Sequence, residues 1–459
     1  MYKLNSNLKV PLHIQLYNEL KEDILNNLKV GDKLPSIRKV ATLYNISTTT
    51  VENAYSQLYA EGYIESIPKK GYFVSDLIDI PFKKPKDIKV KEETKEYIYD
   101  FSPTAHHKSY FPKKIYKRLS NQVLKEDIDF SRYIDGRGDI GLREAIANYL
   151  ISSRGLNAKA SNIVITSSFI DSMSIIAKLL KPKFSKFAIE DPGYYITENI
   201  FKEYGYKIAK VALKNNSINL EEFKKSGAKL VYITPSHQYP TGGVMPISKR
   251  QKLLQYINRV EGYIIEDDYD SELNYTSRPI PALAGLDRSD SVIYSATFAK
   301  ALSPAIRVAY LHLPDSILKL YLNSYDSHFS RVSITTQKVL ERFIKDGYFD
   351  RHLRKIRTIN RKKHNLMLET LHKELKNNFE VLSSGAGLAI LIYPTKPFNW
   401  ERFFKLLEQN RVKIYLASMC NLGGFEAIRL GFGSFDLDEI PKAIKKFSTI
   451  FKESLSVNN

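Results

Sequence analysis

The first 75 residues show hydrophobic positions at helical spacing, followed by a short alternating stretch. Leu12, Leu16, Leu20 and Ile24 recur every four residues and predict an amphipathic helix that ends before Gly31. Two shorter helical patterns, at 34–44 and 45–58, are joined by a tight turn, which is typical of a helix-turn-helix. Residues 62–74 then alternate around a glycine and predict a β-hairpin. A small module that binds other proteins has a similar pattern of short helices, but the hairpin and its basic tip favour nucleic acid.

From Ile163 onward, short apolar runs alternate with longer amphipathic stretches. Apolar runs at 163–166, 187–190 and 230–234 precede helical patterns that continue to Leu180, Tyr204 and Val260. This alternation predicts a mostly parallel sheet with crossover helices. Later in the chain we expect one long basic helix within 323–371, and strands at 386–392 and 426–432. These last strands predict a smaller α+β subdomain.

The two patterns imply a multidomain chain with three segments. Residues 1–75 form the helix-turn-helix unit, and 98–459 form the α/β unit, whose smaller subdomain lies mainly within 345–459. The intervening residues 76–97 contain Pro81, Pro85 and many charged side chains with almost no apolar periodicity, and they predict a mobile linker.

Composition and charge indicate the compartment of the protein and the kind of partner it binds. The chain has 459 residues, of which 43% are hydrophobic, and a single cysteine, Cys420, so it has no internal disulfide. Residues 1–7 lack the apolar run of a secretory signal, and no stretch is apolar enough to cross a membrane. We therefore expect a soluble protein of the cytoplasm. The net charge of +19 favours a polyanionic partner, but only +3 of it lies in residues 1–95, so charge alone does not locate the binding surface.

Candidate chemistry is concentrated around Lys300. An apolar run at 291–294 leads through Thr297 to this lysine, and Arg307 follows after Pro304. A lysine whose pKa is lowered by burial can form a Schiff base with an aldehyde cofactor, while an arginine and a threonine can hold its phosphate. Taken alone, a lysine between two strands is more often simply exposed to solvent.

A second segment strengthens this interpretation. The apolar run 262–266 leads directly into Asp267, Asp268 and Tyr269. Carboxylates at the carboxyl end of a buried strand lie where α/β sheets bind ligands. Pyridoxal phosphate needs an acidic partner for its pyridine nitrogen, and Asp267 is placed to provide it. The alternative is an Asp-Asp turn with a packed tyrosine.

Asp267, Tyr269, Thr297, Lys300 and Arg307 together resemble the cofactor site of fold-type I aminotransferases, over residues 100–452. Residues 10–74 resemble a GntR-type winged helix. The combination is similar to the MocR/GabR-type transcription regulators. This resemblance implies an α/β fold-type I domain that binds pyridoxal 5'-phosphate, a winged helix that binds double-stranded DNA, and a homodimer.

The resemblance also implies roles for individual residues of the large unit. Lys300 would carry the cofactor, and a small amine or amino acid effector would take the place of Lys300 on the cofactor. Arg429 would bind the carboxylate of an effector that has one. Further cofactor contacts would come from Ser168 and Phe169 at the phosphate, Tyr194 against the ring, Tyr269 at the ring hydroxyl, and Tyr133 of the neighbouring subunit. Three positions depart from the aminotransferases, and one of them is Ile170, which stands where glutamine is usual. Ser168 stands where glycine is usual, and Tyr239 stands in the slot of an asparagine, which favours a regulator over an enzyme.

For the winged helix, the resemblance implies that DNA is contacted from both helices of the motif and from the hairpin tip. The residues concerned are Ser36, Arg38, Ser47, Thr48, Thr50, Lys69, Lys70 and Gly71. Ser47 is also suited to cap the second helix of the motif. Thr48 replaces an arginine that related proteins often carry, so a guanine contact of about 1 to 3 kcal/mol would be missing.

The sequence thus favours a regulator that senses pyridoxal phosphate or its adduct with an amine. Two other interpretations stay open, a working aminotransferase with an accessory DNA-binding domain and a DNA-binding structural protein that has lost its cofactor. No metal site is predicted. The effector, the operator and the direction of regulation are not specified by the sequence, and free cofactor can itself be the signal.

Overall fold

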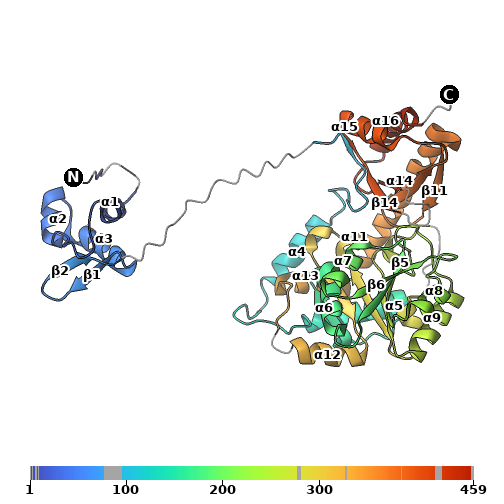
Figure 1. Ribbon diagram of the computed structural model, residues 1–459, viewed down its shortest axis with the longest axis horizontal. Helices are drawn as coiled ribbons and strands as arrows, with labels where there is room; N and C mark the ends of the chain where they lie inside the picture. Colours follow the sequence, from blue (N-terminus) through green and yellow to red (C-terminus); the bar gives the residue numbers. More distant parts are fainter. Residues whose placement is uncertain are drawn as a thin grey trace. The chain divides into compact units, whose positions relative to one another are not determined.

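The computed structural model describes residues 2, 4–5, 8, 10–76, 96–275, 281–325, 328–383, 385–418 and 426–455. The chain divides into two compact units, Met1–Thr94 and Lys95–Asn459, which are drawn in Figure 1. The predicted linker, 76–97, lies almost entirely outside the described residues. Each unit is described by itself.

The amino-terminal unit is a three-helix winged fold, as predicted. It contains α1 (Leu12–Asn26), α2 (Ile37–Tyr44), α3 (Thr48–Ala60) and the antiparallel strands β1 (Ile64–Ile67) and β2 (Gly71–Val74). The apolar faces of the helices meet in one core, and three positions of the predicted stripe in α1, Leu16, Leu20 and Ile24, are buried, whereas Leu12 is half-buried. Burial of these stripes is what holds such short helices together.

Local signals fix the turns of this unit. The Ser36 and Ser47 side chains cap α2 and α3 by accepting hydrogen bonds from backbone N–H groups of the first helical turn. Asn45 ends α2 in the left-handed region, with φ of 51°. At the hairpin tip, Lys69 and Gly71 have φ of 65° and 110°, so the turn places two left-handed residues around Lys70.

The large unit is built on a seven-stranded sheet in the order β4-β10-β9-β8-β7-β5-β6. Its strands are β4 (Ile163–Thr166), β5 (Lys186–Asp191), β6 (Lys207–Ala212), β7 (Leu230–Ile233), β8 (Tyr263–Asp267), β9 (Val292–Thr297) and β10 (Ala309–His312). Only β10 runs antiparallel to its neighbours. The predicted mostly parallel sheet is therefore confirmed.

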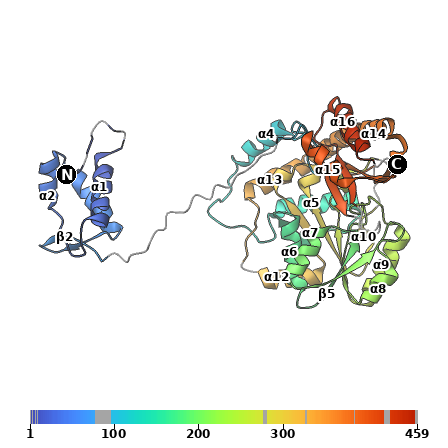
Figure 2. The same ribbon diagram turned by 45° about the horizontal axis from the view of Figure 1, so that its top comes forward.

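Helices cover both faces of this sheet, so the strands in its interior are mainly apolar, whereas the edge strand β6 carries exposed lysines. Ile264 and Ile265, adjacent on β8, belong to different core clusters, one on each face. In both Figure 1 and Figure 2, α6 and α7 lie on one side and α8 and α9 on the other. The helices before and between the strands are α4 (Lys113–Val123), α5 (Ile140–Arg154), α6 (Phe169–Leu180), α7 (Tyr195–Glu203), α8 (Leu220–Ser226), α9 (Ile247–Arg259), α10 (Leu283–Leu286) and α11 (Phe298–Ala301).

The predicted single helix within 323–371 is wrong. The chain instead forms α12 (Asp315–Tyr325), α13 (Ile334–Lys345) and α14 (Tyr348–Leu375). Gly347 separates the last two with φ of 71°, a conformation that cannot continue a right-handed helix. The 28 residues of α14 are the long helix of this region.

The smaller subdomain packs a four-stranded antiparallel sheet against α14 and the final helix. The strand order is β11-β12-β15-β14, with β11 (Phe379–Ser383), β12 (Ala389–Pro394), β14 (Tyr415–Ser418) and β15 (Glu426–Gly431). It is completed by α15 (Trp400–Gln409) and α16 (Glu439–Glu453). Near the start of the unit, β3 (Tyr99–Asp100) pairs in parallel with β13 (Val412–Lys413). Among the described residues, no helix has the length and apolar character that a membrane crossing requires.

Candidate functional site

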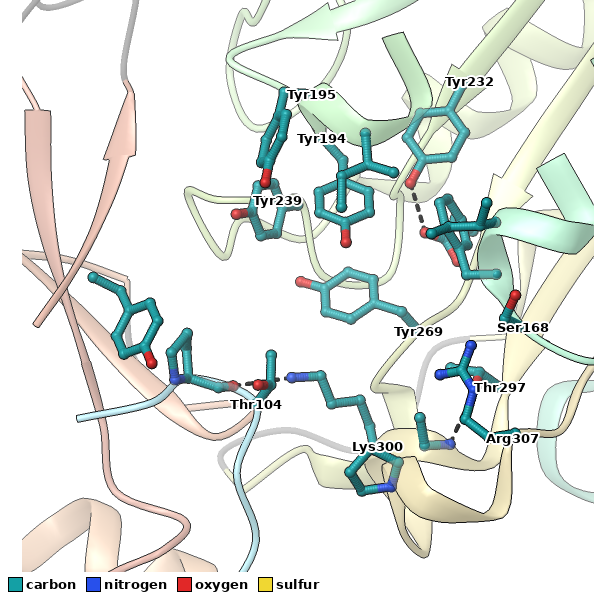
Figure 3. A pocket seen from close by; sticks show the side chains of 18 of the residues that line it. Thr104, Ser168, Tyr194, Tyr195, Tyr232, Tyr239, Tyr269, Thr297, Lys300 and Arg307 are labelled. Carbon is teal, nitrogen blue, oxygen red and sulfur yellow. Dashed lines mark hydrogen bonds between the residues drawn. The ribbon is translucent and has the colours of Figure 1, made fainter. Parts of the chain in front are cut away.

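A cavity of about 430 Å³ opens where several strands of the large sheet end (Figure 3). Asp267 ends β8 and Thr297 ends β9, so both lie at the carboxyl edge where α/β sheets bind ligands. Because β10 runs in the reverse direction, it begins at this same edge, which brings Arg307 to the cavity. Further lining comes from Pro103, Thr104, Ser167, Ser168, Phe169, Ile170, Tyr194, Tyr195, Ile196, Tyr232, Tyr239, Tyr269, Ala299, Lys300, Pro304, Val308, Tyr415, Leu416 and Arg429.

Lys300 presents a buried amine to this cavity. It lies on the four-residue helix α11, whose start is capped by the Thr297 side chain. The lysine Nζ donates a hydrogen bond to the carbonyl of Pro103 at 2.9 Å, and it has no carboxylate partner among the described residues. Burial, and then the positive charge of Arg429, lower the pKa of Lys300 to about 8. The neutral, nucleophilic form is therefore far more accessible than in an ordinary lysine.

Asp267 is a buried carboxyl group without a cationic partner in the described structure. It accepts a hydrogen bond from the Tyr232 hydroxyl at 2.5 Å. Burial raises its pKa to about 8, against the lowering effect of that hydrogen bond. A positively charged N–H group placed next to Asp267 would supply the missing countercharge. The pyridine nitrogen of pyridoxal phosphate is such a group.

Another part of the cavity offers hydrogen-bond donors that suit an anion. Arg307 adopts the left-handed conformation, with φ of 55°, and no carboxylate of the described residues pairs with its guanidinium. Figure 3 shows its guanidinium beside Ser168 and Thr297. Ser168 caps α6, so the first turn of that helix lies at the cavity. A helix amino terminus beside an arginine is suited to a phosphate group.

Thr297, predicted as a phosphate ligand, is also engaged within the protein. Its hydroxyl donates to the Val308 carbonyl at 3.3 Å and accepts from the N–H of Ala299 at 3.1 Å. It thereby joins the end of β9 to the turn that carries Lys300.

Aromatic side chains form the remaining wall. Tyr269 projects into the cavity, with its hydroxyl 3.1 Å from Nδ1 of His237, which in turn lies 2.8 Å from Asp270. Tyr194 packs edge-to-face against Phe169, with ring centroids 5.5 Å apart. The predicted contacts Tyr194, Phe169 and Tyr269 therefore all reach the same cavity.

Arg429 enters the cavity from β15 of the smaller subdomain. Its Nη1 donates to the Tyr239 hydroxyl at 2.8 Å, and its guanidinium carbon lies 4.8 Å from the centroid of the Tyr239 ring. The predicted carboxylate-binding arginine and the tyrosine in the asparagine slot are thus direct partners.

Tyr133 lies apart from the cavity of its own chain. Its side chain is 79% exposed and stacks on Phe329, with ring centroids 4.2 Å apart. It does not line this cavity, and its contact with a neighbouring subunit stays a prediction.

Sequence reasoning missed several lining residues. Pro103 and Thr104 come from the segment that follows β3, and nothing in their local pattern indicates that they reach Lys300. Tyr232 stands within an apolar strand, and a tyrosine in that setting could have been suspected of binding a buried polar group. Tyr195 and Tyr415 carry no distinguishing signal.

In the amino-terminal unit, all but one of the predicted DNA contacts are exposed. Ser36, Arg38, Ser47, Thr48, Lys69, Lys70 and Gly71 are exposed, and Thr50 is half-buried. The buried face of α3 is formed instead by Val51, Ala54, Tyr55 and Leu58. The first turn of α3 is therefore free to enter a DNA groove, whereas its later turns hold the core.

Comparisons with known proteins match both units. Residues 12–74 match the family "Bacterial regulatory proteins, gntR family", and residues 103–447 match "Aminotransferase class I and II". Over 98% of both chains, the protein is 34% identical to the uncharacterized HTH-type transcriptional regulator YdeL of Bacillus subtilis. It is 29% identical to the probable rhizopine catabolism regulatory protein MocR of Rhizobium meliloti, over 85% of this chain and 83% of the relative. An archaeal alanine:glyoxylate aminotransferase structure matches with a TM-score of 0.69 and 25% identity, covering 78% of this chain and 91% of that one.

Proposed function

Because the chain belongs to the MocR-type HTH transcriptional regulators, which join a gntR-family domain to an aminotransferase class I and II domain, we propose that it senses pyridoxal 5'-phosphate. In this proposal the cofactor, or its adduct with an amine, changes how the winged helix engages double-stranded DNA. Such a regulator would act in the cytoplasm, the location expected from the sequence.

The observation that carries the proposal is the arrangement of Lys300, Asp267 and Arg307 around one cavity. Pyridoxal phosphate supplies an aldehyde that condenses with amines and a ring that withdraws electrons. The aldehyde of the cofactor needs a nucleophilic amine, its ring nitrogen needs an acid, and its phosphate needs a cation. The cavity offers one of each, and none of the three is neutralised by an ion pair within the described residues.

Each residue has a defined task. Lys300, with its pKa lowered to about 8, provides the amine, and Asp267 holds the proton on the ring nitrogen. Arg307, with Ser168 at the start of α6, holds the phosphate. The Tyr269 hydroxyl, which lies 3.1 Å from Nδ1 of His237, would donate to the ring oxygen, and Tyr194 and Phe169 would border the ring.

The effector would be an amine that carries a carboxylate. Its amine would replace Lys300 on the cofactor, and its carboxylate would pair with Arg429 through a charge-assisted, bidentate contact. Arg429 belongs to the smaller subdomain, whereas Lys300 belongs to the large sheet. One effector would thus link the two subdomains, and a coupling of about 1 to 3 kcal/mol is enough to shift DNA occupancy severalfold.

We expect the working form to be a homodimer. The exposed Tyr133 is available to complete the phosphate site of a second copy, and paired winged helices suit paired DNA half-sites. The contacts to DNA would come from the first turn of α3, from Ser36 and Arg38, and from Lys69, Lys70 and Gly71 of the hairpin.

The binding of pyridoxal phosphate and its attachment to Lys300 are tested by spectroscopy and mass spectrometry. The purified protein, incubated with pyridoxal phosphate, should absorb visible light and retain the cofactor covalently after borohydride reduction. Peptide mapping should place the label on Lys300 and not on Lys363, which is also buried, has a pKa lowered to about 8, and lies outside the cavity. Label spread over surface lysines, or label retained in Lys300→Ala, would contradict the proposal.

The regulatory role is tested by electrophoretic mobility shift and footprinting on the region upstream of the protein's own gene. Binding should change when pyridoxal phosphate or an amino acid is added to the wild type, and should not change in Lys300→Ala. DNA affinity that is identical under all conditions would remove the sensing role.

The runner-up function is catalysis by a complete aminotransferase. It is favoured by the retention of the lysine, the acid and both arginines in one cavity, within a fold that matches an aminotransferase over 78% of this chain. Sustained turnover of an amino donor and a keto acid, at rates of about 1 per second or more, would establish it. A single half-reaction without turnover would favour the sensor.

A further inference from the structure

Arg429 already has a partner in the effector site. The Tyr239 hydroxyl accepts a hydrogen bond from its Nη1 at 2.8 Å, and the Tyr239 ring faces its guanidinium at 4.8 Å. No carboxylate of the described residues lies within ion-pair distance of Arg429. The phenol of Tyr239 gives Arg429 an oxygen acceptor and the negative face of an aromatic ring. An effector carboxylate would offer the same two features, an acceptor and negative charge, in a stronger form.

The backbone that carries Tyr239 is held firmly. Its N–H donates to Oγ1 of Thr234 at 3.0 Å, and its carbonyl accepts from Nε2 of Gln238 at 2.6 Å. Thr234 and Gln238 are buried and both donate to the buried carboxylate of Glu190. Because this network fixes the loop, a change at Tyr239 is confined to its side chain.

The ring itself is less constrained than its backbone. Tyr239 is half-buried and meets its aromatic neighbours Tyr194 and Tyr269 edge-to-face, at centroid distances of 5.0 and 6.4 Å. Figure 3 shows it on the side of the cavity next to Tyr194 and Tyr195. A ring held by edge contacts and one hydrogen bond can rotate away without disturbing the sheet.

We propose that Tyr239 occupies the carboxylate site of Arg429 when no effector is bound, and that a carboxylate-bearing effector binds by displacing it. The inference rests on the proposed role of Arg429. A carboxylate can displace the phenol because its ionic, bidentate contact with a guanidinium is stronger than a neutral one. An amine without a carboxylate cannot replace the phenol as the partner of Arg429. Tyr239 therefore acts as a specificity determinant that favours effectors with a carboxylate.

Displacement would also change the connection between the subdomains. Tyr239 belongs to the loop after β7 of the large sheet, and Arg429 belongs to β15 of the smaller one. Their hydrogen bond joins these two elements directly. An effector would replace this link with one that passes through itself.

The test compares the full-length wild type with Tyr239→Phe and Tyr239→Leu. The probes are 3-phenylpropanoate, which has a carboxylate but no amine and so does not react with the cofactor, and the neutral analogue 3-phenylpropan-1-ol. Isothermal titration calorimetry should show about tenfold tighter binding of the carboxylate to Tyr239→Phe, since the competing hydrogen bond to a charged group is lost. Binding of the alcohol should change less than twofold. Tyr239→Leu, which also removes the ring from the guanidinium, should gain at least as much.

Equal affinity of the wild type and Tyr239→Phe for the carboxylate would overturn the proposal, and so would the absence of measurable binding to either protein. A gain that persists in the double variant with Arg429→Gln would also overturn it, because the gain would then not depend on Arg429. Visible absorbance of the same samples reports the cofactor separately. A gain in affinity without cofactor absorbance would refute the proposed cofactor and leave the displacement intact.

Discussion

The lowered pKa of Lys300 gives a quantitative prediction for the attachment of the cofactor. At pH 7.5 a lysine with a pKa of 10.5 is neutral in about one molecule in a thousand, whereas one with a pKa of about 8 is neutral in roughly a quarter. Only the neutral amine attacks an aldehyde, so the rate of attachment should rise with pH and level off above about pH 8. Near neutral pH the reactive, neutral fraction should be roughly 200-fold larger than for an ordinary lysine.

Arg429→Gln is the informative perturbation, because the charge of Arg429 is the second cause of the lowered pKa after burial. Removing this charge leaves burial in place, so the midpoint should move upward but stay below that of an exposed lysine. Arg402→Gln is the matched control, since Arg402 is exposed on α15 of the same subdomain and its loss changes the net charge equally.

The assay is stopped-flow absorbance after mixing with pyridoxal phosphate from pH 6 to pH 10, with borohydride trapping to confirm the product. The ionisations of the cofactor are common to all three proteins, so midpoints are compared between proteins. A wild-type rate that still rises above pH 9.5, or an Arg429→Gln midpoint that does not move upward, would refute the reasoning.

Three further changes have defined outcomes. Ser47→Ala should destabilise the amino-terminal unit by about 1 kcal/mol through the lost cap of α3, whereas the exposed Ser56→Ala should change it by less than 0.5, as measured by urea unfolding of the full chain. Arg154→Met should cost about 3 to 5 kcal/mol and lower the thermal midpoint of the large unit, because it leaves the buried carboxylate of Asp268 without its ion-pair partner at 2.7 Å. In the cofactor-free protein, Asp267→Asn should stabilise more at pH 8 than at pH 6. The folded-state pKa of about 8 lies above the unfolded value near 3.9, so ionisation lowers the stability of the wild type as pH rises, by about 2 kcal/mol over this interval; a pH-independent difference would contradict this.

The sequence predicted the elements, and it pointed to several residues that line one cavity, because local patterns indicate both. Buried strands that end in Asp267 and lead to Lys300 can be read from apolar runs, and the winged unit can be read from its helical stripes and hairpin glycine. Parallel strands bring their ends to one edge, so residues far apart in the chain could be placed together. The resemblance to known families then supplied roles that spacing alone left open.

What the sequence could not provide depends on tertiary contacts. The hydrogen bond between Lys300 and Pro103 joins residues 197 positions apart, and the one between Arg429 and Tyr239 joins residues 190 apart. No local sequence pattern indicates either of these hydrogen bonds. The prediction of a single helix failed for a different reason, because the left-handed backbone conformation of Gly347 separates α13 from α14.

The contact between Lys300 and Pro103 has a consequence for the first residues of the large unit. Pro103 lies three residues beyond β3, at the point where the polypeptide enters the large unit. An amine that forms a covalent bond elsewhere can no longer anchor this entry segment. Loading of the lysine would therefore release the segment around Pro103, while the pairing of β3 with β13 would still hold the residues just before it.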